Sequence, residues 1–325
     1  METNEHKIAI AVVDVGGTKI AGAVALYDTG NPGAPQLVCR NTVPTDAQRG
    51  GDVVLETILS LVDDLVRTSP IPVSAIGVGT AGRVDARTGN IAYANEIMPG
   101  WSGQPLGDAL RSRTNLPVAV MNDVQAHALG EARWGAGTGA RTCLVIAVGT
   151  GLGGVIIAHG QLVRGYHGFA GELGAVASPL NLSRFGESDS LESVAAGSGI
   201  EARYMAAGGE ELSGAEIAKR AADGEPLARQ IIEQAGYALG LSLADFATLL
   251  DPELAIVSGS VTKAGIVWRN ALERAYSQRV APVLSGLPIV NAELGSDAPL
   301  IGAAELAYDL LQELFDRDDA CPSRA

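Results

Sequence analysis

Apolar runs of strand length alternate with glycine-rich turns in both halves of the chain. In the first half, residues 8–13 lead into the turn Asp14-Val15-Gly16-Gly17-Thr18-Lys19, and a second apolar run covers residues 20–27. The second half repeats this arrangement with residues 142–148, Gly149-Thr150-Gly151-Leu152-Gly153-Gly154 and residues 155–159. Short apolar runs bounded by glycines predict buried strands, so we expect one hairpin with a glycine-rich turn in each half.

Helical apolar spacing occurs in four other segments. It predicts helices over residues 52–68, 124–134, 226–250 and 302–314, with further strands over residues 73–79, 116–121 and 254–257. Pro226 stands in the first turn of the third of these helices, and Asp251-Pro252 is a stop signal. Residues 316–325 are expected to form a frayed tail.

Length and internal repetition indicate two lobes. A chain of 325 residues exceeds the size at which a single hydrophobic core usually keeps growing. The repeated hairpin indicates two related α/β lobes whose turns would offer backbone N–H groups to phosphates in a shared cleft. The lobes are expected to comprise residues 1–122 with 302–325, and residues 123–301.

The composition narrows the choice of function. The net charge of -14 would repel a nucleic-acid backbone, whose neutralisation supplies much of the binding free energy. Cys39, Cys143 and Cys321 are odd in number and far apart, which favours reduced thiols over a disulfide framework. No apolar run approaches the roughly 20 residues that span a bilayer. We therefore expect a cytoplasmic protein that binds neither nucleic acid nor membrane.

The first glycine-rich turn suits a nucleotide. Gly16 and Gly17 let backbone amides approach phosphate oxygens, and Thr18 can donate a hydrogen bond. Asp14 can hold a water molecule bound to Mg²⁺. An ordinary hairpin turn is the simpler interpretation, but a buried strand seldom ends in an Asp that has no partner.

The second glycine-rich turn formally matches a dinucleotide fingerprint. Gly149, Gly151 and Gly154 have the G-x-G-x-x-G spacing, but that fingerprint requires a helix after the glycines, and a strand is predicted here. A dinucleotide-dependent dehydrogenase is therefore disfavoured. A second phosphate-binding turn is the preferred interpretation, because the two turns together support it more than either does alone.

Polar residues at three other places are candidates for substrate binding. Asn122-Asp123 stands where a strand ends and a helix begins, and ligands of open α/β sheets gather at such strand ends. The alternative is that one of this pair only caps the helix. Glu172 lies in a glycine-rich loop and is a weak signal, and Glu192 carries no signal of its own.

Two further motifs complete a recognisable order. Residues 168–174 form the glycine-rich loop around Glu172, and Ser258-Gly259-Ser260 follows the last predicted strand. The order of motifs from Asp14 to Gly259 resembles that of the ROK family of sugar kinases and repressors over nearly the whole chain. The resemblance implies an actin-like, ribonuclease-H-like α/β fold of two duplicated βββαβα-type lobes that close on ATP and a sugar.

The resemblance also implies a role for each motif. The residues that would bind ATP and Mg²⁺ are Asp14, Gly16, Gly17, Thr18, Lys19, Gly149, Thr150, Gly151 and Gly153, with Gly259 near adenosine. Asp123 corresponds to the family's catalytic base, which takes the proton of the attacking hydroxyl. Asn122, Asp123, Glu172 and Glu192 correspond to its sugar-binding positions, and the phosphorylated group in such kinases is commonly the 6-hydroxyl.

The sequence departs from the ROK pattern at the family's zinc site. The Glu-x-Gly-His element reads Glu172-Leu173-Gly174-Ala175 here, and residues 180–191 contain no cysteine. The histidine and thiolate ligands are thus missing together, so we expect no structural zinc. Leu180, Leu182 and Phe185 are expected to hold this segment by packing instead.

The missing histidine also affects which sugar-like substrate is expected to accept the phosphate. Ala175 deletes a hydrogen bond near the C1/C2 side of glucose, which favours an amino sugar or a C7 cyclitol with a free hydroxymethyl group. Related kinases act on such substrates in actinobacterial antibiotic pathways, and the Arg-, Ala- and Gly-rich composition is compatible with that source.

Other functions within the family are the alternatives. They are a glucokinase or N-acyl-hexosamine kinase that lacks zinc, and a sugar sensor that does not catalyse. A repressor is not expected, because only 13 residues precede Asp14 and the net charge is negative. A homodimer is the expected assembly.

Overall fold

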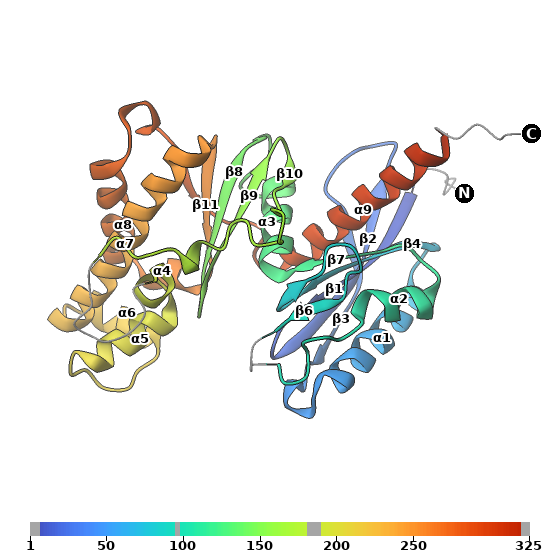
Figure 1. Cartoon of the computed structure of the whole chain (residues 1–325), viewed down its shortest axis with the longest axis horizontal. Coiled ribbons are helices and arrows are strands. Elements are labelled where there is room, and N and C mark those ends of the chain that lie inside the picture. Colours follow the sequence, from blue (N-terminus) through green and yellow to red (C-terminus); the bar gives the residue numbers. More distant parts are fainter. Residues whose placement is uncertain (1–6, 95–97, 181–189, 320–325) are drawn as a thin grey trace, which may run out of the picture. The chain divides into compact units, whose positions relative to one another are not determined.

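The protein folds into two compact units (Figure 1). The computed structural model describes residues 7–94, 98–180 and 190–319. Unit 1 comprises Met1–Gly135 and Leu294–Ala325, and unit 2 comprises Ala136–Glu293. The chain therefore leaves unit 1 after Gly135 and returns to it at Leu294.

Unit 1 contains a mixed five-stranded sheet. Its strands are β1 Lys7–Val15, β2 Lys19–Asp28, β3 Gln36–Pro44, β4 Val73–Thr80 and β7 Val118–Asn122, in the order β3-β2-β1-β4-β7. Strands β1 to β3 form an antiparallel meander, and β4 and β7 continue the sheet in the direction of β1. The other elements are the small hairpin of β5 Arg83–Val84 and β6 Ile91–Tyr93 and the helices α1 Gly51–Thr68, α2 Leu106–Thr114, α3 Asp123–Trp134 and α9 Ala298–Asp319.

Unit 2 repeats this topology. Its strands are β8 Cys143–Val148, β9 Leu152–Ala158, β10 Gln161–Leu162, β11 Leu254–Ser258 and β12 Ile289–Asn291, in the order β10-β9-β8-β11-β12. Strands β8 to β10 are again antiparallel, and β11 and β12 run parallel to β8. The helices are α4 Leu191–Ala195, α5 Gly197–Ala206, α6 Gly214–Ala222, α7 Pro226–Leu250 and α8 Ile266–Arg279. The expected duplication is confirmed.

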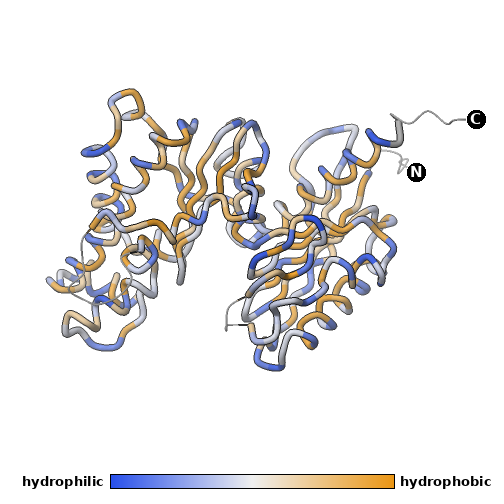
Figure 2. The backbone as a smooth tube through the Cα atoms, in the orientation of Figure 1, coloured by the Kyte–Doolittle hydropathy of each residue, from blue (hydrophilic) through white to orange (hydrophobic). Residues whose placement is uncertain are grey.

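The sheet of unit 1 is buried on both faces, because its strands alternate between two cores. On β1, Ala9, Ala11 and Val13 belong to one apolar cluster, whereas Ile10 and Val12 belong to another. Helices α1 and α2 contribute to the first cluster and α9 contributes to the second. Figure 2 shows the same result as mostly hydrophobic colouring along the strands. Along β1 only residues near the two ends are not fully buried, whereas the edge strand β3 exposes Arg40, Asn41 and Thr42 in its middle.

Helix α3 packs closely against α9 within unit 1. At Gly130 of α3, a Cβ atom would lie 2.2 Å from the carbonyl oxygen of Ala298. At Gly302 of α9, a Cβ atom would lie 1.8 Å from the carbonyl oxygen of Ala126. Glycine at these two positions lets the helix backbones touch.

This packing decides where the units divide. We expected the divisions after residue 122 and before residue 302, but the structure places them after Gly135 and before Leu294. Helix α3 and the first turn of α9 therefore both belong to unit 1. The sequence pattern marks where motifs begin, and it does not show which helices touch.

The end of the described chain differs from the expected frayed tail. Helix α9 continues through residues 316–319 and ends at Asp319. Glu313 and Arg317 stand four residues apart on it and approach to 3.9 Å, an arrangement that supports helical structure. The expectation was therefore wrong for residues 316–319.

Two of the three cysteines lie in the described part of the chain. Cys39 and Cys143 are free thiols, and Cys321 lies outside the described residues. Within residues 7–94, 98–180 and 190–319, no helix is long and apolar enough to cross a membrane.

Candidate active site

Two carboxylates meet at the carboxyl edge of the sheet in unit 1. Asp14 near the end of β1 pairs with Gly79 of β4, and Thr80 pairs with Asn122 at the end of β7. A Cβ atom at Gly79 would lie 3.7 Å from Oδ1 of Asp14 and 3.9 Å from Cα of Asp123. Because Gly79 has no side chain, the space between Asp14 and Asp123 stays open.

Burial raises the pKa values of both carboxyls. The pKa of Asp14 rises from 3.8 to about 6, mainly because of burial and further because of the charge of Asp123, while Lys19 acts in the opposite direction. Burial also raises the pKa of Asp123, against hydrogen bonds from backbone N–H groups, Val124 first among them. This edge thus holds two carboxyls whose pKa values both lie above the ordinary value of an aspartate.

Asn122 is the N-cap of α3. Its Oδ1 accepts hydrogen bonds from the N–H groups of Val124 at 2.9 Å and Gln125 at 3.4 Å, and its Nδ2 donates to the carbonyl oxygen of Gly82 at 2.9 Å. Asn122 thus caps the helix, and its predicted place in the sugar site remains a prediction. Asp123 follows as the first residue of α3, and one of its oxygens also accepts from Val124 N at 2.9 Å.

Thr45 holds the first glycine-rich turn in place through two hydrogen bonds. The turn closes with a hydrogen bond from Gly16 N to Lys19 O at 3.0 Å. The buried Thr45 donates from Oγ1 to Gly16 O at 2.6 Å and from its N–H to Thr18 O at 3.1 Å. Thr18 and Lys19 are exposed. Sequence reasoning missed Thr45, because only the pairing of β2 with β3 brings it to this turn.

The second turn is tighter than expected. It closes with a hydrogen bond from Gly149 N to Gly151 O at 2.9 Å, and β9 already begins at Leu152. Gly153 and Gly154 therefore lie in the sheet instead of the turn, paired with β8. A Cβ atom at Gly154 would lie 2.4 Å from Cδ1 of Leu173, so this glycine serves packing.

The start of α5 braces the second turn. Gly197 N donates to Gly149 O at 2.8 Å, and Ser198 donates to Thr150 O from both N at 3.1 Å and Oγ at 2.8 Å. These bonds fix the carbonyl groups of the turn. Gly197 and Ser198 were not identified from the sequence, where nothing distinguishes them from an ordinary helix start.

Glu192 connects the second turn with the loop that carries Glu172. Its Oε2 accepts a hydrogen bond from Leu152 N at 2.8 Å, and a Cβ atom at Gly174 would lie 3.3 Å from its own Cβ. Glu172 immediately precedes the short 3-10 helix Leu173–Ala175 and is exposed. Two of the predicted sugar-binding residues thus lie on neighbouring segments of unit 2.

The segment predicted to replace zinc is only partly described. Leu180 packs against the main apolar cluster of unit 2. Leu182 and Phe185 lie outside the described residues. Over the parts of the chain that are described, no three His, Cys, Asp or Glu side chains are placed to hold a metal ion.

Unit 2 contains a cavity of about 530 Å³ beside the second turn. It is lined by Thr150, by residues of α5 and α6 and by the segment that follows Gly259, including Glu201, Lys219 and Lys263. Gly259 has φ 95°, and a Cβ atom there would lie 2.3 Å from Val148 O, so only glycine fits. The cavity has the size of a small-molecule site.

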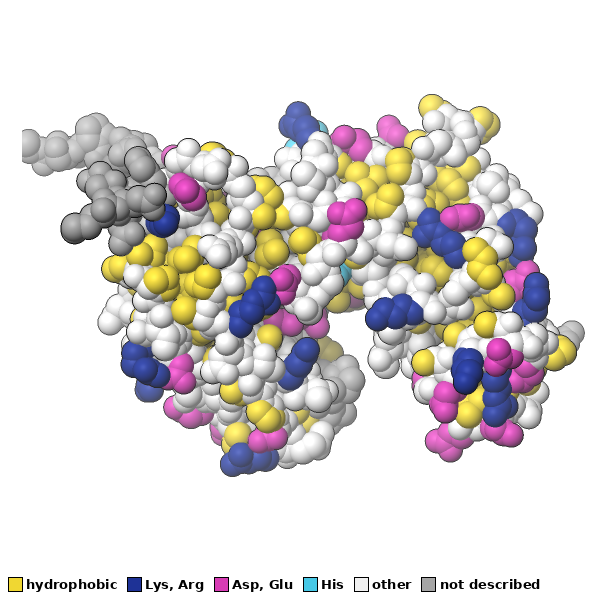
Figure 3. Space-filling view, turned by 180° about the vertical axis from the view of Figure 1, so that it is seen from behind, with side chains coloured by type: hydrophobic (Ala, Val, Ile, Leu, Met, Phe, Trp, Pro, Cys, Tyr) yellow, Lys and Arg dark blue, Asp and Glu magenta, His cyan; other side chains and the backbone are white. Residues whose placement is uncertain are grey.

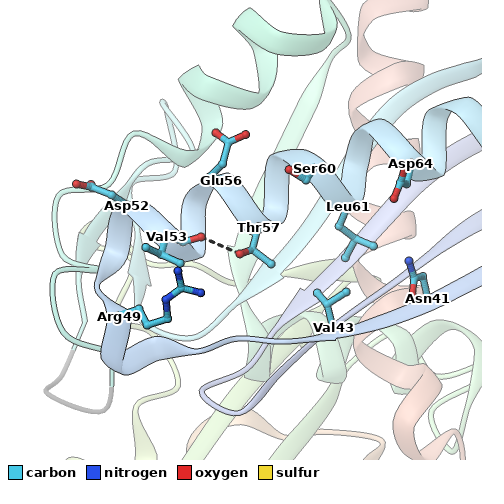
Figure 4. A pocket seen from close by; sticks show the side chains of 10 residues that line it. All are labelled: Asn41, Val43, Arg49, Asp52, Val53, Glu56, Thr57, Ser60, Leu61 and Asp64. Atoms are coloured by element: carbon cyan, nitrogen blue, oxygen red, sulfur yellow. Dashed lines mark hydrogen bonds between the residues drawn. The ribbon is translucent and has the colours of Figure 1, made fainter.

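A second cavity, of about 550 Å³, lies in unit 1 between α1 and β3 (Figure 4). Its lining side chains, such as Asp52, Glu56 and Asn41, come from the outer part of the unit, and none of the predicted site residues is among them. It therefore offers no support for the expected chemistry.

The surface shows no dominant basic patch on the face in Figure 3. Lys and Arg side chains are scattered there among Asp, Glu and neutral side chains. This distribution accords with the net charge of -14 and gives no support for nucleic-acid binding.

The chain is similar to known proteins in both sequence and structure. Residues 10–310 match the model of the ROK family. A glucokinase from Halalkalibacterium halodurans is 33% identical over 319 residues, which cover 90% of this chain and 93% of the relative. The solved structure of a ROK hexokinase from Thermus thermophilus has a TM-score of 0.81 at 31% identity and covers 94% of this chain and 99% of its own. A ROK family glucokinase from Streptomyces griseus, in complex with glucose and AMPPNP, has a TM-score of 0.70 at 29% identity and covers 93% and 99%.

Proposed function

This chain belongs to the ROK family and is an ATP-dependent sugar kinase, and we propose that it phosphorylates the primary hydroxyl of a hexose-like acceptor with Asp123 as general base. Its fold is the actin-like, ribonuclease-H-like fold of that family, as the match to the hexokinase structure confirms. The observation that carries the proposed mechanism is the pairing of Asp14 and Asp123 at the carboxyl edge of the unit 1 sheet.

The proposed step needs one proton acceptor. The acceptor hydroxyl attacks the γ-phosphorus of ATP, the bond from that phosphorus to the bridging oxygen of ADP breaks, and the hydroxyl proton passes to Asp123. Burial raises the pKa of Asp123, which strengthens it as a base. Its place at the start of α3, fixed by the cap that Asn122 forms, holds the carboxylate in a defined position.

Asp14 fits a role with Mg²⁺. A carboxylate next to an exposed glycine-rich turn offers the hard oxygen ligand that this ion prefers. Asp14 would hold Mg²⁺ directly or through water, and the ion would neutralise phosphate charge. Gly16, Gly17, Thr18 and Lys19 would add donors to the phosphates.

The nucleoside would bind in the unit 2 cavity. The cavity shares Thr150 with the second turn, so a nucleoside there would have its phosphates near Gly149 and Gly151. The relative from Streptomyces griseus binds an ATP analogue, which supports this assignment. Lys219 and Lys263 give the cavity two cationic groups in an acidic protein.

The acceptor would be an amino sugar or a hexose-like cyclitol. Ala175 stands where the family has a histidine, and it is exposed next to the loop of Glu172 and Glu192. A glucose hydroxyl without this partner would lose about 1–3 kcal/mol. The loss corresponds to roughly 5–150-fold in kcat/KM. A substrate altered on that side would escape the penalty.

A panel of acceptors tests this proposal. ADP formation would be followed with glucose, N-acetylmannosamine, glucosamine and a C7 cyclitol, and ³¹P NMR would locate the phosphate. We expect transfer to the primary hydroxyl and a higher kcat/KM for an amino sugar or cyclitol than for glucose. Glucose as the best acceptor would refute the acceptor assignment and leave the kinase assignment intact.

Glucokinase activity is the second candidate, because the relatives from Halalkalibacterium halodurans and Streptomyces griseus are glucokinases. The variant Ala175→His separates the two. If the missing imidazole limits glucose use, this variant raises kcat/KM for glucose. If glucose is already the natural acceptor, the substitution improves it little.

A further inference from the structure

Glu131 is a buried carboxylate that the proposed chemistry does not use. It lies in the last turns of α3 and has 0% of its surface exposed. Carboxylates are almost never fully buried unless they are paired, so its partners need to be identified. Its Oε1 accepts a hydrogen bond from Leu294 N at 2.7 Å.

The second oxygen of Glu131 lies against Gly135. A Cβ atom at Gly135 would lie 2.1 Å from Oε2 of Glu131 and 3.0 Å from Cγ of Leu294. Gly135 and Leu294 are therefore close neighbours, and the carboxylate contacts both. These two residues are the last and the first of unit 1 at the points where the chain leaves it and returns to it.

The same helix begins with the proposed base. Asp123 and Glu131 are eight residues apart on α3, and His127 lies between them and interacts electrostatically with both. The close backbone packing of α3 on α9 makes the pair of helices a stiff support. A displacement at the end of α3 would therefore be carried to Asp123 at its start.

We propose that Glu131 is a positioning residue of the kinase, whose buried carboxylate holds the two chain crossings of unit 1 together and thereby fixes α3 and Asp123. The inference rests on the proposed role of Asp123. It assigns Glu131 no contact with substrate. Oε1 of Glu131 accepts from Leu294 N, and Oε2 lies against Gly135, so the carboxylate contacts both segments.

Glu131→Gln tests the proposal with little change in volume. It replaces the carboxylate by a neutral amide, whose remaining oxygen is a weaker acceptor for Leu294 N and whose NH₂ group replaces the oxygen beside Gly135. We expect kcat to fall by roughly tenfold or more, since small misplacements of catalytic groups cost that much or more. ADP affinity, measured by calorimetry, should stay within about twofold, because the proposed nucleotide cavity lies wholly in unit 2.

Glu305→Gln is the matched control. Glu305 is the other almost fully buried carboxylate in the described part of the chain, and it joins α9 to Tyr27 and Arg133 instead of the crossings. We expect it to lower the melting temperature like Glu131→Gln but to keep kcat within about twofold. Equal effects of the two variants on kcat would overturn the proposal.

A second variant tests the proposal even if Glu131→Gln does not fold. Gly135→Ala pushes a methyl group against the carboxylate and leaves Glu131 in place. Its kcat should also fall by roughly tenfold. Wild-type kcat in a folded Gly135→Ala protein would overturn the proposal.

Amide hydrogen exchange separates this inference from the kinase assignment. Exchange at Leu294 should be faster in Glu131→Gln than in Glu305→Gln, whether or not any tested sugar is phosphorylated. Equal protection of the Leu294 amide in the two variants would refute the proposal that Glu131 holds the two chain crossings together. A wild-type protein that phosphorylates no acceptor would refute only the proposed function.

Discussion

At the residue scale, the paired carboxyls of Asp14 and Asp123 combine two requirements that conflict. The proposed roles as proton acceptor and Mg²⁺ ligand both require ionised carboxylates, but burial favours protonation of both, and the charge of Asp123 adds to this at Asp14. The site is therefore strained when no nucleotide or ion is bound. Catalytic sites commonly trade stability for function in this way.

The first prediction concerns Asp123. The variant Asp123→Asn should lower kcat by about 10²-fold or more, because the amide cannot accept the hydroxyl proton. Sugar and nucleotide binding should change little, since the side chain keeps its shape. Steady-state kinetics and calorimetry would measure this. Near-normal turnover would remove Asp123 from the mechanism.

The second prediction concerns Asp14 and pH. The pKa of Asp14 is about 6 in the folded chain against an ordinary 3.8, so the folded state binds the proton more tightly than the unfolded state. Binding of this proton stabilises the folded state, fully so below about pH 4, and this stabilisation is lost as the pH rises through about 6. Asp14→Asn should therefore be more stable than the wild type at pH 7.5, by about 1–3 kcal/mol, and this gain should vanish near pH 4.

Urea unfolding at the two pH values would measure this difference. The same variant should bind MgATP weakly, because the ligand for the ion is lost. An Asp14→Asn protein that is less stable than the wild type at pH 7.5 would contradict the predicted strain.

At the element scale, each glycine-rich turn depends on a neighbouring element. Thr45 holds the first turn from the end of the paired strand, and the start of α5 holds the second. These hydrogen bonds hold the turns in place, and if the turns bind phosphate as proposed, this would lower the entropic cost of binding.

The third prediction tests the brace under the first turn. Thr45→Val removes the donor to Gly16 O and should cost about 1–3 kcal/mol, because a partly buried carbonyl oxygen loses its partner. The KM for ATP should rise as well.

Thr57→Val is the control, since Thr57 Oγ1 donates within α1 to Val53 O at 2.8 Å (Figure 4). It should change stability by only about 0.5 kcal/mol and leave KM unaltered. Identical KM values in the two variants would contradict the assigned role.

At the scale of the whole molecule, unit 1 is joined from two distant parts of the sequence. Arg133 of α3 donates to Glu305 at 2.8 Å and to both oxygens of Asp309 on α9, and Tyr27 of β2 donates to Glu305 at 2.7 Å. This network fastens the last segment of the chain to the first. Burial, and after it the charge and hydrogen bond of Glu305, also raise the pKa of Tyr27, which stays protonated.

The fourth prediction addresses this network. Arg133→Met leaves Glu305 buried without its cation and should lower the free energy of unfolding by about 2–5 kcal/mol. Adding Glu305→Leu should recover part of the loss, because the uncompensated charge then disappears. Thermal and urea unfolding would measure both proteins. A double variant less stable than Arg133→Met would contradict the explanation.

The sequence alone determined the two hairpins, the main helices and the candidate residues, but it did not predict β3, α2, α5, α6 or α8. Short apolar runs predicted the strands, helical spacing predicted the helices, and repetition of the hairpin predicted the duplication, because period and turn chemistry are local properties. Asp14 and Asp123 were found in the same way, since both follow buried strands. The proposed roles of Glu172 and Glu192 came from resemblance to the ROK family, because single carboxylates in loops carry no local signal.

Only the tertiary structure decided which distant residues support the site. Thr45, Gly79 and Glu131 acquire their roles from contacts with segments that lie far away in the sequence or across the sheet. The division of the units was decided in the same way, by the backbone contact of α3 with α9. The physical reason is that burial, close approach and raised pKa values arise from packing, and packing depends on the whole chain.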